Sequence, residues 1–176
     1  MYLISIYFDE KTNQRIKEYM QQVAVKTGNT FMIDGNVPPH ITVGAFETKN
    51  EEEVIAALEK VLQEQKPGKV QLVSVGTFQS SSIFLSAVYS EYLHELCKNV
   101  CEVLENVDNT LLRSNYKPFQ WMPHVTIGKT LSKDQQKTAF EVLQNCFGPW
   151  EAMVLQIGLA KTNPYKDIFC LPIKRL

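Results

Sequence analysis

The sequence predicts a mixed α/β protein in which one structural unit occurs twice. Two short segments match in character, Pro-His-Ile-Thr-Val-Gly at 39–44 and Pro-His-Val-Thr-Ile-Gly at 123–128, with an offset of 84 residues. The same offset places the predicted helix after the first segment on the one after the second, and residues 70–76 on 154–160. A correspondence that holds through a motif, a helix and a strand is not expected by chance, so we infer an internal repeat.

Strand and helix signals alternate through both halves. Leu3–Phe8 is rich in β-branched and aromatic residues and predicts a strand, and Asp9 is a suitable N-cap for a helix that continues to about Lys26. Phe31–Ile33 is expected as a short strand, followed by a turn at 34–36. The remaining expected elements are a motif strand at 40–46, a helix capped by Asn50 and stopped by Pro67-Gly68, strands at 70–78 and 83–89 joined by a serine-rich turn at 80–82, a helix at 91–106, an irregular stretch at 108–119, a motif strand at 121–129, a helix capped by Ser132 and ended by Gly148-Pro149, and a closing hairpin of 153–160 and 168–173 around 163–165.

Each half therefore reads strand, helix, motif strand, helix, strand. We expect the halves to pack as two similar lobes about a pseudo-two-fold axis, each with helices on the outside of its sheet. Such an axis would make the two motifs face each other.

Composition limits the classes of partner. The chain has 176 residues, of which 44% are hydrophobic and 21% charged, and its formal net charge is −1. A protein that coats long nucleic acid normally carries a strong basic surplus, which this chain lacks. A local group of lysines would still suffice to bind one phosphate at the end of a strand.

The cysteines and the N-terminus indicate a reducing, cytoplasmic location. The four cysteines contain no Cys-x-x-Cys pair and are expected to be free thiols. A metal site of His94, Cys97 and Cys101 lacks a fourth ligand nearby, so we expect no bound metal. Residues 1–8 have neither the basic start nor the cleavage site of a signal peptide, and no segment reaches the ~20 apolar residues that span a bilayer.

The repeated segment carries residues suited to acid–base chemistry. Side chains alternate faces along a strand, so His40 and Thr42 point the same way, as do His124 and Thr126. Two imidazoles across a cleft can act as general base and general acid, because the usual pKa of histidine is about 6.5. The threonine hydroxyls can donate hydrogen bonds to phosphate oxygens.

One His-x-Thr segment alone would be weak support, because histidines on half-buried strands are commonly just hydrogen-bonded. Here two of the three histidines occupy equivalent places in the repeat, each preceded by Pro and followed by the same Thr and Gly. His94 lacks this context and is expected on the surface of a helix.

The paired motifs and the duplicated layout resemble the 2H phosphoesterase superfamily, in particular its 2'-5' RNA ligase or LigT-like branch with cyclic phosphodiesterases. The resemblance covers essentially the whole chain, 1–176, as a single domain of two pseudo-symmetric lobes. It implies two antiparallel-type sheets that face a central cleft, with helices outside. It also implies a metal-independent, cofactor-free enzyme in which His40 and His124 are catalytic and Thr42 and Thr126 bind phosphate.

Other residues are expected to contact substrate. An arginine often follows the second threonine by three residues in the ligase-like branch, and Lys129 stands there, which keeps the charge but loses bidentate geometry. Phe46 and Phe8, with its neighbour Tyr7, could stack on a base, although aromatic strand residues usually pack in the core. Lys161 and Lys166 flank the last hairpin loop and could approach the cleft mouth.

Three functions remain open at this point. The first is a phosphodiesterase that opens 2',3'-cyclic phosphates or acts on 2'-5' linkages, with a nucleotide or RNA end as partner, no membrane, and a monomeric chain. The second is a non-catalytic module that binds an RNA end or nucleotide. The third is 2'-5' RNA end-joining, the reverse reaction at the same site.

Overall fold

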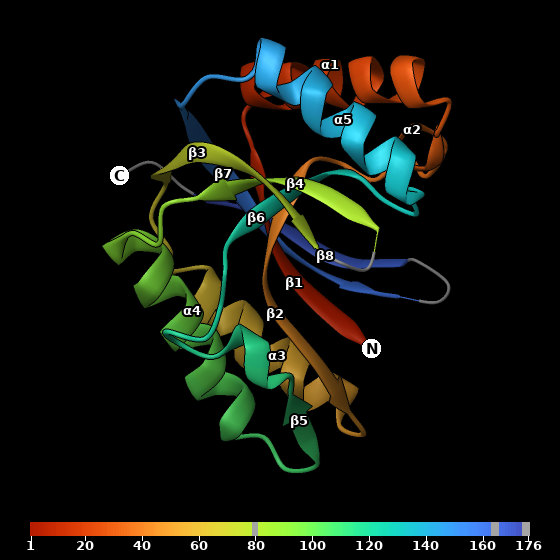
Figure 1. Cartoon of the computed structure of the whole chain (residues 1–176). Helices are drawn as coiled ribbons and strands as arrows, with labels where there is room; N and C mark the ends of the chain where they lie inside the picture. Colours follow the sequence, from red (N-terminus) through yellow and green to blue (C-terminus); the bar gives the residue numbers. More distant parts are fainter. Residues whose placement is uncertain (79–80, 163–165, 174–176) are drawn as a thin grey trace.

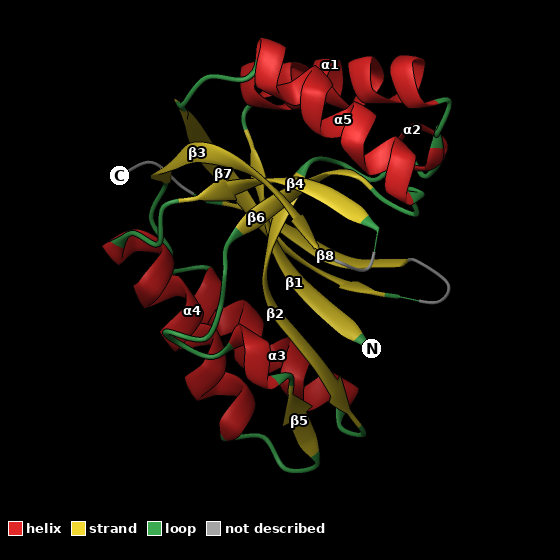
Figure 2. Ribbon diagram, viewed as in Figure 1, coloured by secondary structure: helices red, strands yellow, loops and turns green. Residues whose placement is uncertain are grey.

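The computed structural model describes residues 1–78, 81–162 and 166–173. Strands and helices alternate along the chain, which confirms the mixed α/β class (Figures 1 and 2). The expected loop at 163–165 and part of the serine-rich turn lie outside the described residues. The elements are β1 (Tyr2–Phe8), α1 (Glu10–Thr27), α2 (Phe31–Asp34), β2 (His40–Thr48), α3 (Glu51–Leu62), β3 (Gly68–Phe78), β4 (Ser82–Ala87), α4 (Glu91–Glu105), β5 (Thr110–Leu112), the 3-10 helix η1 (Ser114–Tyr116), β6 (His124–Gly128), α5 (Lys133–Cys146), β7 (Trp150–Lys161) and β8 (Lys166–Pro172).

The strands form one antiparallel, eight-stranded sheet in the order β5-β2-β1-β7-β3-β4-β6, with β8 paired to β7. Two helix pairs cover it on opposite sides (Figure 2). The pair α1 and α5, with α2 beside it, contacts β3, β4 and β6, whereas α3 and α4 form the other pair and α4 contacts β2 and β5. Strands β2 and β6, which carry the motifs, contact each other. The motifs are therefore brought together by the fold.

The two halves of the sequence exchange elements in the structure, so neither half alone supplies one side of the fold. Strand β7 of the second half pairs with β1 of the first, and β3 pairs with β4. Each helix pair likewise takes one helix from each half. The residue pattern within each half predicts its strands and helices. It does not predict which half supplies the neighbouring strand or helix, so the exchange could not be predicted from the sequence.

The register of β3 with β7 reflects the repeat. Val70 pairs with Ala152, and moving both residues by 84 positions gives Val154 and Gly68, which are also a pair. The two copies of the third strand are thus paired to each other in a register consistent with a pseudo-two-fold axis. This seam joins the β2-β1-β7 part of the sheet to the β3-β4-β6 part.

Local signals explain where the long helices begin and end. The side chain of Asp9 accepts a hydrogen bond from the Thr12 amide at the start of α1, and Gly28 ends that helix with a left-handed φ of 71°. Ser132 and Gln135 form a capping box at the start of α5, as the Ser132 prediction required. Asn50 is the N-cap residue of α3, but its side chain makes no capping hydrogen bond.

Two local expectations were wrong. Residues 31–34 form the short helix α2 instead of a strand, and the stretch expected to be irregular contains β5 and η1. Both segments are short, so neither a helical nor a strand period could be read from them. The offset of the repeat places α2 on η1, so each motif strand follows a short helical turn.

Candidate active site

Both motifs begin the strands on which they lie. His40 is the first residue of β2 and His124 is the first residue of β6. Both imidazoles and both motif threonines are partly buried, whereas Ile41 and Val125 between them are fully buried. The alternation predicted from the sequence is therefore present, and it leaves the polar side chains of both motifs on the accessible face.

The glycine that follows each motif is explained by packing. A Cβ on Gly44 would lie 2.9 Å from Cγ1 of Val100 on α4, and one on Gly128 would lie 3.0 Å from Cγ2 of Ile83. The first approach is shorter than real Cβ contacts and the second is tighter than most of them, so a side chain at either position would require the neighbouring side chain to move. The shared glycine thus serves the fold, which separates it from the histidine and threonine of the same motif.

The two imidazoles are held in the same way. Nδ1 of His40 lies 2.8 Å from the carbonyl oxygen of Pro38, and Nδ1 of His124 lies 2.8 Å from that of Met122. A carbonyl oxygen only accepts, so each Nδ1 carries the hydrogen and donates it. In a neutral ring, Nε2 then has the free lone pair, and in a charged ring Nε2 becomes a donor. Each histidine is therefore oriented to exchange protons through Nε2.

The electrostatic surroundings of the two histidines differ. Burial lowers the pKa of His40 below its usual value, the hydrogen bond to Pro38 opposes that shift, and the positive charges of His124 and Lys129 lower it further. Burial also lowers the pKa of His124, against the hydrogen bond to Met122. The effect of His124 and Lys129 on His40 places both positive charges near that ring, where they favour its neutral form.

The threonines have different neighbours across their sheets. Thr42 pairs with Ser5 on β1, and their hydroxyl oxygens lie 3.4 Å apart. Thr126 pairs with Phe84 on β4. The residue opposite Thr126 is thus apolar, and the Thr126 hydroxyl remains available to a ligand.

A cavity of about 220 Å³ joins the two motifs. Its polar lining includes His40 from the first motif, and Thr126 and Lys129 from the second, so residues 84 or more positions apart in the sequence share one space. The rest of its wall is mostly apolar and comes from β1, α2 and β7. The lining residues are Leu3, Ser5, Tyr7, Phe31, Met32, Val37, His40, Thr126, Lys129 and Ala160.

Several expected contacts are not in this cavity. Phe46 and Phe8 are 0% and 3% exposed, so both rings are core residues and cannot offer a face to a base. The pairing of Lys161 with Glu51, with Nζ and Oε2 3.2 Å apart, holds that lysine on the side of α3. Tyr7, Phe31 and Met32 line the cavity, and of these the sequence had indicated only Tyr7. Phe31 and Met32 were missed because their segment was read as a strand.

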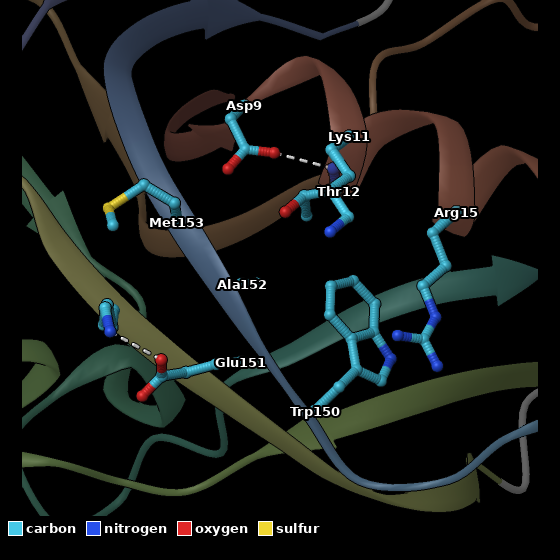
Figure 3. Close-up of a pocket in the computed structure, with 9 residues that line it drawn as sticks. Asp9, Lys11, Thr12, Arg15, Trp150, Glu151, Ala152 and Met153 are labelled. Atoms are coloured by element: carbon cyan, nitrogen blue, oxygen red, sulfur yellow. Dashed lines mark hydrogen bonds and ion pairs between the residues drawn. The ribbon is translucent and has the colours of Figure 1, made fainter.

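A second cavity of about 250 Å³ lies at the start of α1 and contains no motif residue (Figure 3). Two of its three cationic side chains, Arg15 and Lys69, are engaged within the protein. The guanidinium of Arg15 lies 4.5 Å from the centroid of the Trp150 ring, and Nζ of Lys69 lies 2.7 Å from Oε1 of Glu151. We therefore place the chemistry in the cavity between the motifs.

Cys97 and Cys101 do not form a metal site with His94. Both thiols are directed at the carbonyl oxygen of Tyr116, at 3.2 and 3.5 Å, while Nδ1 of His94 lies 3.1 Å from the Tyr89 hydroxyl. Across the described ranges, no three His, Cys, Asp or Glu side chains are grouped so that they could hold a metal ion. None of the helices described is long and apolar enough to cross a membrane.

The sequence profile of the 2'-5' RNA ligase superfamily matches residues 11–165. The chain belongs to this superfamily. The match confirms the resemblance to 2H phosphoesterases and supports a phosphodiesterase-type activity. A comparison with curated proteins finds no match.

Solved structures share the fold over nearly the whole chain. TT0787 of Thermus thermophilus is 14% identical with a TM-score of 0.64, and 98% of this chain and 97% of that one are covered. E. coli LigT complexed with 3'-AMP is 15% identical with a TM-score of 0.61, covering 99% and 98%. Usb1 of Kluyveromyces marxianus is 15% identical with a TM-score of 0.51, covering 97% of each chain. These likenesses confirm the 2H phosphoesterase fold.

Proposed function

We propose that the protein is a metal-independent phosphodiesterase that opens 2',3'-cyclic phosphates at a nucleotide or RNA end. The observation that carries this proposal is the shared cavity, in which His40 of one motif meets Thr126 and Lys129 of the other. Two oriented imidazoles, hydroxyl donors and one positive charge are the groups that water addition to a phosphodiester requires. Superfamily membership and the 3'-AMP bound to the LigT relative support the same substrate class.

We assign the general base to His40 and the general acid to His124. His40 is influenced by the positive charges of both His124 and Lys129, so the neutral form is favoured at His40 when one of the two rings is protonated. Nε2 of His40 takes a proton from water as the water oxygen bonds to phosphorus. The bond from phosphorus to the 3'-oxygen breaks, and His124 gives its Nε2 proton to that oxygen. The product is a 2'-phosphate, in the orientation that the family resemblance implies.

Thr126 and Lys129 are placed to hold the phosphate. The Thr126 hydroxyl and the Lys129 ammonium can donate to the non-bridging oxygens, and Lys129 opposes their negative charge. Thr42 shares its hydroxyl with Ser5 at a long 3.4 Å, so it can turn toward the same oxygens. This set keeps the charged phosphate between the two Nε2 atoms.

The apolar part of the cavity fits a nucleoside. Phe31, Met32 and Val37 form one wall, and the described lining contains no Asn, Gln, Asp or Glu side chain. Amide and carboxylate side chains are common readers of base edges, whereas apolar and aromatic walls accept any base. We therefore expect weak discrimination among the four 2',3'-cyclic nucleotides.

The test is turnover of a 2',3'-cyclic mononucleotide by the purified protein, with chromatography against 2'- and 3'-phosphate standards. The proposal predicts a 2'-phosphate product and unchanged turnover in EDTA. A pure 3'-phosphate product would reverse the assignment of acid and base. Loss of turnover in EDTA, restored by a divalent ion, would replace the two-histidine mechanism with metal catalysis. No product from any cyclic phosphate would favour a non-catalytic binding module, and joined RNA ends would favour 2'-5' end-joining.

A further inference from the structure

The segment that leads into the second motif carries an exposed aromatic ring in a strained position. Phe119 is 82% exposed, and its φ of 63° lies in the left-handed region, which side chains with a Cβ rarely adopt. An exposed phenyl ring gains nothing from burial, so the fold alone does not account for it. Strained residues that the surrounding structure holds in place are concentrated at functional sites.

The ring is supported on one side by other aromatic residues. Its centroid lies 4.8 Å from that of His94, with an interplanar angle of 35°, and 6.0 Å from that of Tyr89. The Phe119 amide donates to the Tyr89 hydroxyl at 3.3 Å, and that hydroxyl in turn lies 3.1 Å from Nδ1 of His94. Tyr89 packs against Trp121, which is only 6% exposed. His94, expected as a surface helix residue, is thus a partly buried support for Phe119.

Further contacts fix the segment on both sides of Phe119. The Tyr116 carbonyl accepts from the thiols of Cys97 and Cys101, and Lys117 pairs with Glu105 at 2.7 Å. Beyond Phe119, the Ala87 amide donates to the Pro123 carbonyl at 2.9 Å. A ring held in this way loses little freedom when a flat ligand stacks on its open face.

The segment that carries Phe119 leads directly to His124 of the second motif. Met122, three residues after Phe119, supplies the carbonyl that orients His124. His124 lies five positions after Phe119, so their Cα atoms lie at most about 18 Å apart. The cavity that we assign to the terminal nucleoside lies on the His40 side. The rest of an RNA strand leaves the terminal nucleoside through its 5'-oxygen, and a strand that turns back past His124 would meet Phe119.

We propose that Phe119 is a stacking platform for a nucleobase of an RNA strand whose cyclic-phosphate end lies between the two histidines. The proposal rests on the proposed function and narrows its substrate from free mononucleotides to RNA ends. Bases of single-stranded RNA are commonly bound by stacking on aromatic side chains, without need for a specific sequence. A phenyl ring with one face packed and the other open provides that contact.

The test compares two substrates, a 2',3'-cyclic mononucleotide and a tetranucleotide RNA that ends in the same cyclic phosphate. We expect the wild type to have the lower KM for the tetranucleotide. Phe119→Ala should raise that KM about 5- to 150-fold, the usual effect of losing one stacked base, and leave the KM for the mononucleotide unchanged. Phe119→Trp should keep the low value. Leu111→Ala is the matched control, because Leu111 is 70% exposed on β5 in the same connection.

Two results would overturn the platform. One is an unchanged KM for the tetranucleotide in Phe119→Ala, and the other is an equal loss with both substrates, which would mean that the ring acts by holding His124. If the wild type turns over neither substrate, the proposed function fails and the platform is tested by binding. The probe is then a fluorescent tetranucleotide with a 3'-terminal phosphate. Binding that Phe119→Ala abolishes supports the platform, whereas equal binding by both proteins, or none by the wild type, refutes it.

Discussion

The two motifs have the same sequence pattern but different surroundings. His40 has one aromatic neighbour, Tyr7, at 6.1 Å between ring centroids, and it borders the open cavity. His124 packs against Phe78 and Phe84, at 5.0 and 5.1 Å between ring centroids, and those two rings also contact each other. The repeat therefore set the imidazoles in equivalent hydrogen bonds, and the residues around them then diverged. In the mechanism that we propose, these different neighbours would make one histidine the base and the other the acid.

One difference between equivalent positions of the repeat accompanies the cavity on the side of the first motif. Val37 lines the cavity before the first motif, and the repeat offset places Trp121 at the equivalent position before the second. The larger indole of Trp121 is buried and packs against Tyr89, whereas Val37 borders an open cavity. The second side instead presents the exposed ring of Phe119. The molecule thus has a cavity beside His40 and an exposed aromatic ring in the segment that leads to His124.

The largest expected effect comes from removing either imidazole. His40→Ala and His124→Ala should each lower kcat by at least ~100-fold, the usual consequence of losing a positioned acid or base. Steady-state turnover of a 2',3'-cyclic mononucleotide measures the loss, and thermal unfolding checks that each variant is folded. Near-normal turnover in either folded variant would end the two-histidine account.

Lys129 should matter less than the histidines and chiefly for binding. Lys129→Ala removes a charged donor to the phosphate, which we expect to raise KM about tenfold with a smaller fall in kcat. The matched control is Lys11→Ala, because Lys11 borders the second cavity and no motif residue. A variant whose kcat falls while its KM is unchanged would show that Lys129 acts only in the transition state.

Substitution of the glycine that follows each motif tests whether both halves depend on the same close packing for stability. Gly44→Ala and Gly128→Ala should each lower the free energy of unfolding by about 1–3 kcal/mol, because the added methyl group overpacks a core. The approach is tighter at Gly44, 2.9 Å against 3.0 Å, and the neighbours at both sites, Val100 and Ile83, are β-branched and stiff. Urea unfolding measures both. If neither variant is destabilised, close packing does not explain why both motifs are followed by glycine.

The smallest effect concerns the strain at Phe119. Phe119→Gly and Phe119→Ala both remove the ring, but only glycine adopts the left-handed conformation without cost. Phe119→Gly should therefore be the more stable of the two by about 1 kcal/mol. Equal stabilities in urea unfolding would mean that the segment relaxes and stores no strain.

Much of this arrangement could be predicted from residues alone. The period-two pattern of the motifs gave the faces of His40 and Thr42, and the cap residues Asp9 and Ser132 gave the starts of two helices. The exchange of strands between halves could not be predicted, because pairing is decided by long-range contacts such as those of β1 with β7. The wall formed by Phe31 and Met32 was hidden for a related reason, since a one-turn helix leaves no period to detect.

The central claim is that one imidazole acts as a base in its neutral form and the other acts as an acid in its protonated form. The pH dependence of kcat/KM tests this claim most directly. Activity should fall at low pH as His40 gains a proton and at high pH as His124 loses one. Burial lowers the pKa of both, so both limbs should lie below about 6.5, the usual pKa of histidine. Lys129→Gln should move the acidic limb to higher pH by removing a charge that lowers the pKa of His40, while Lys11→Gln should not move it. A bell-shaped curve with that displacement is the predicted result, and a curve with one limb or none would contradict the account.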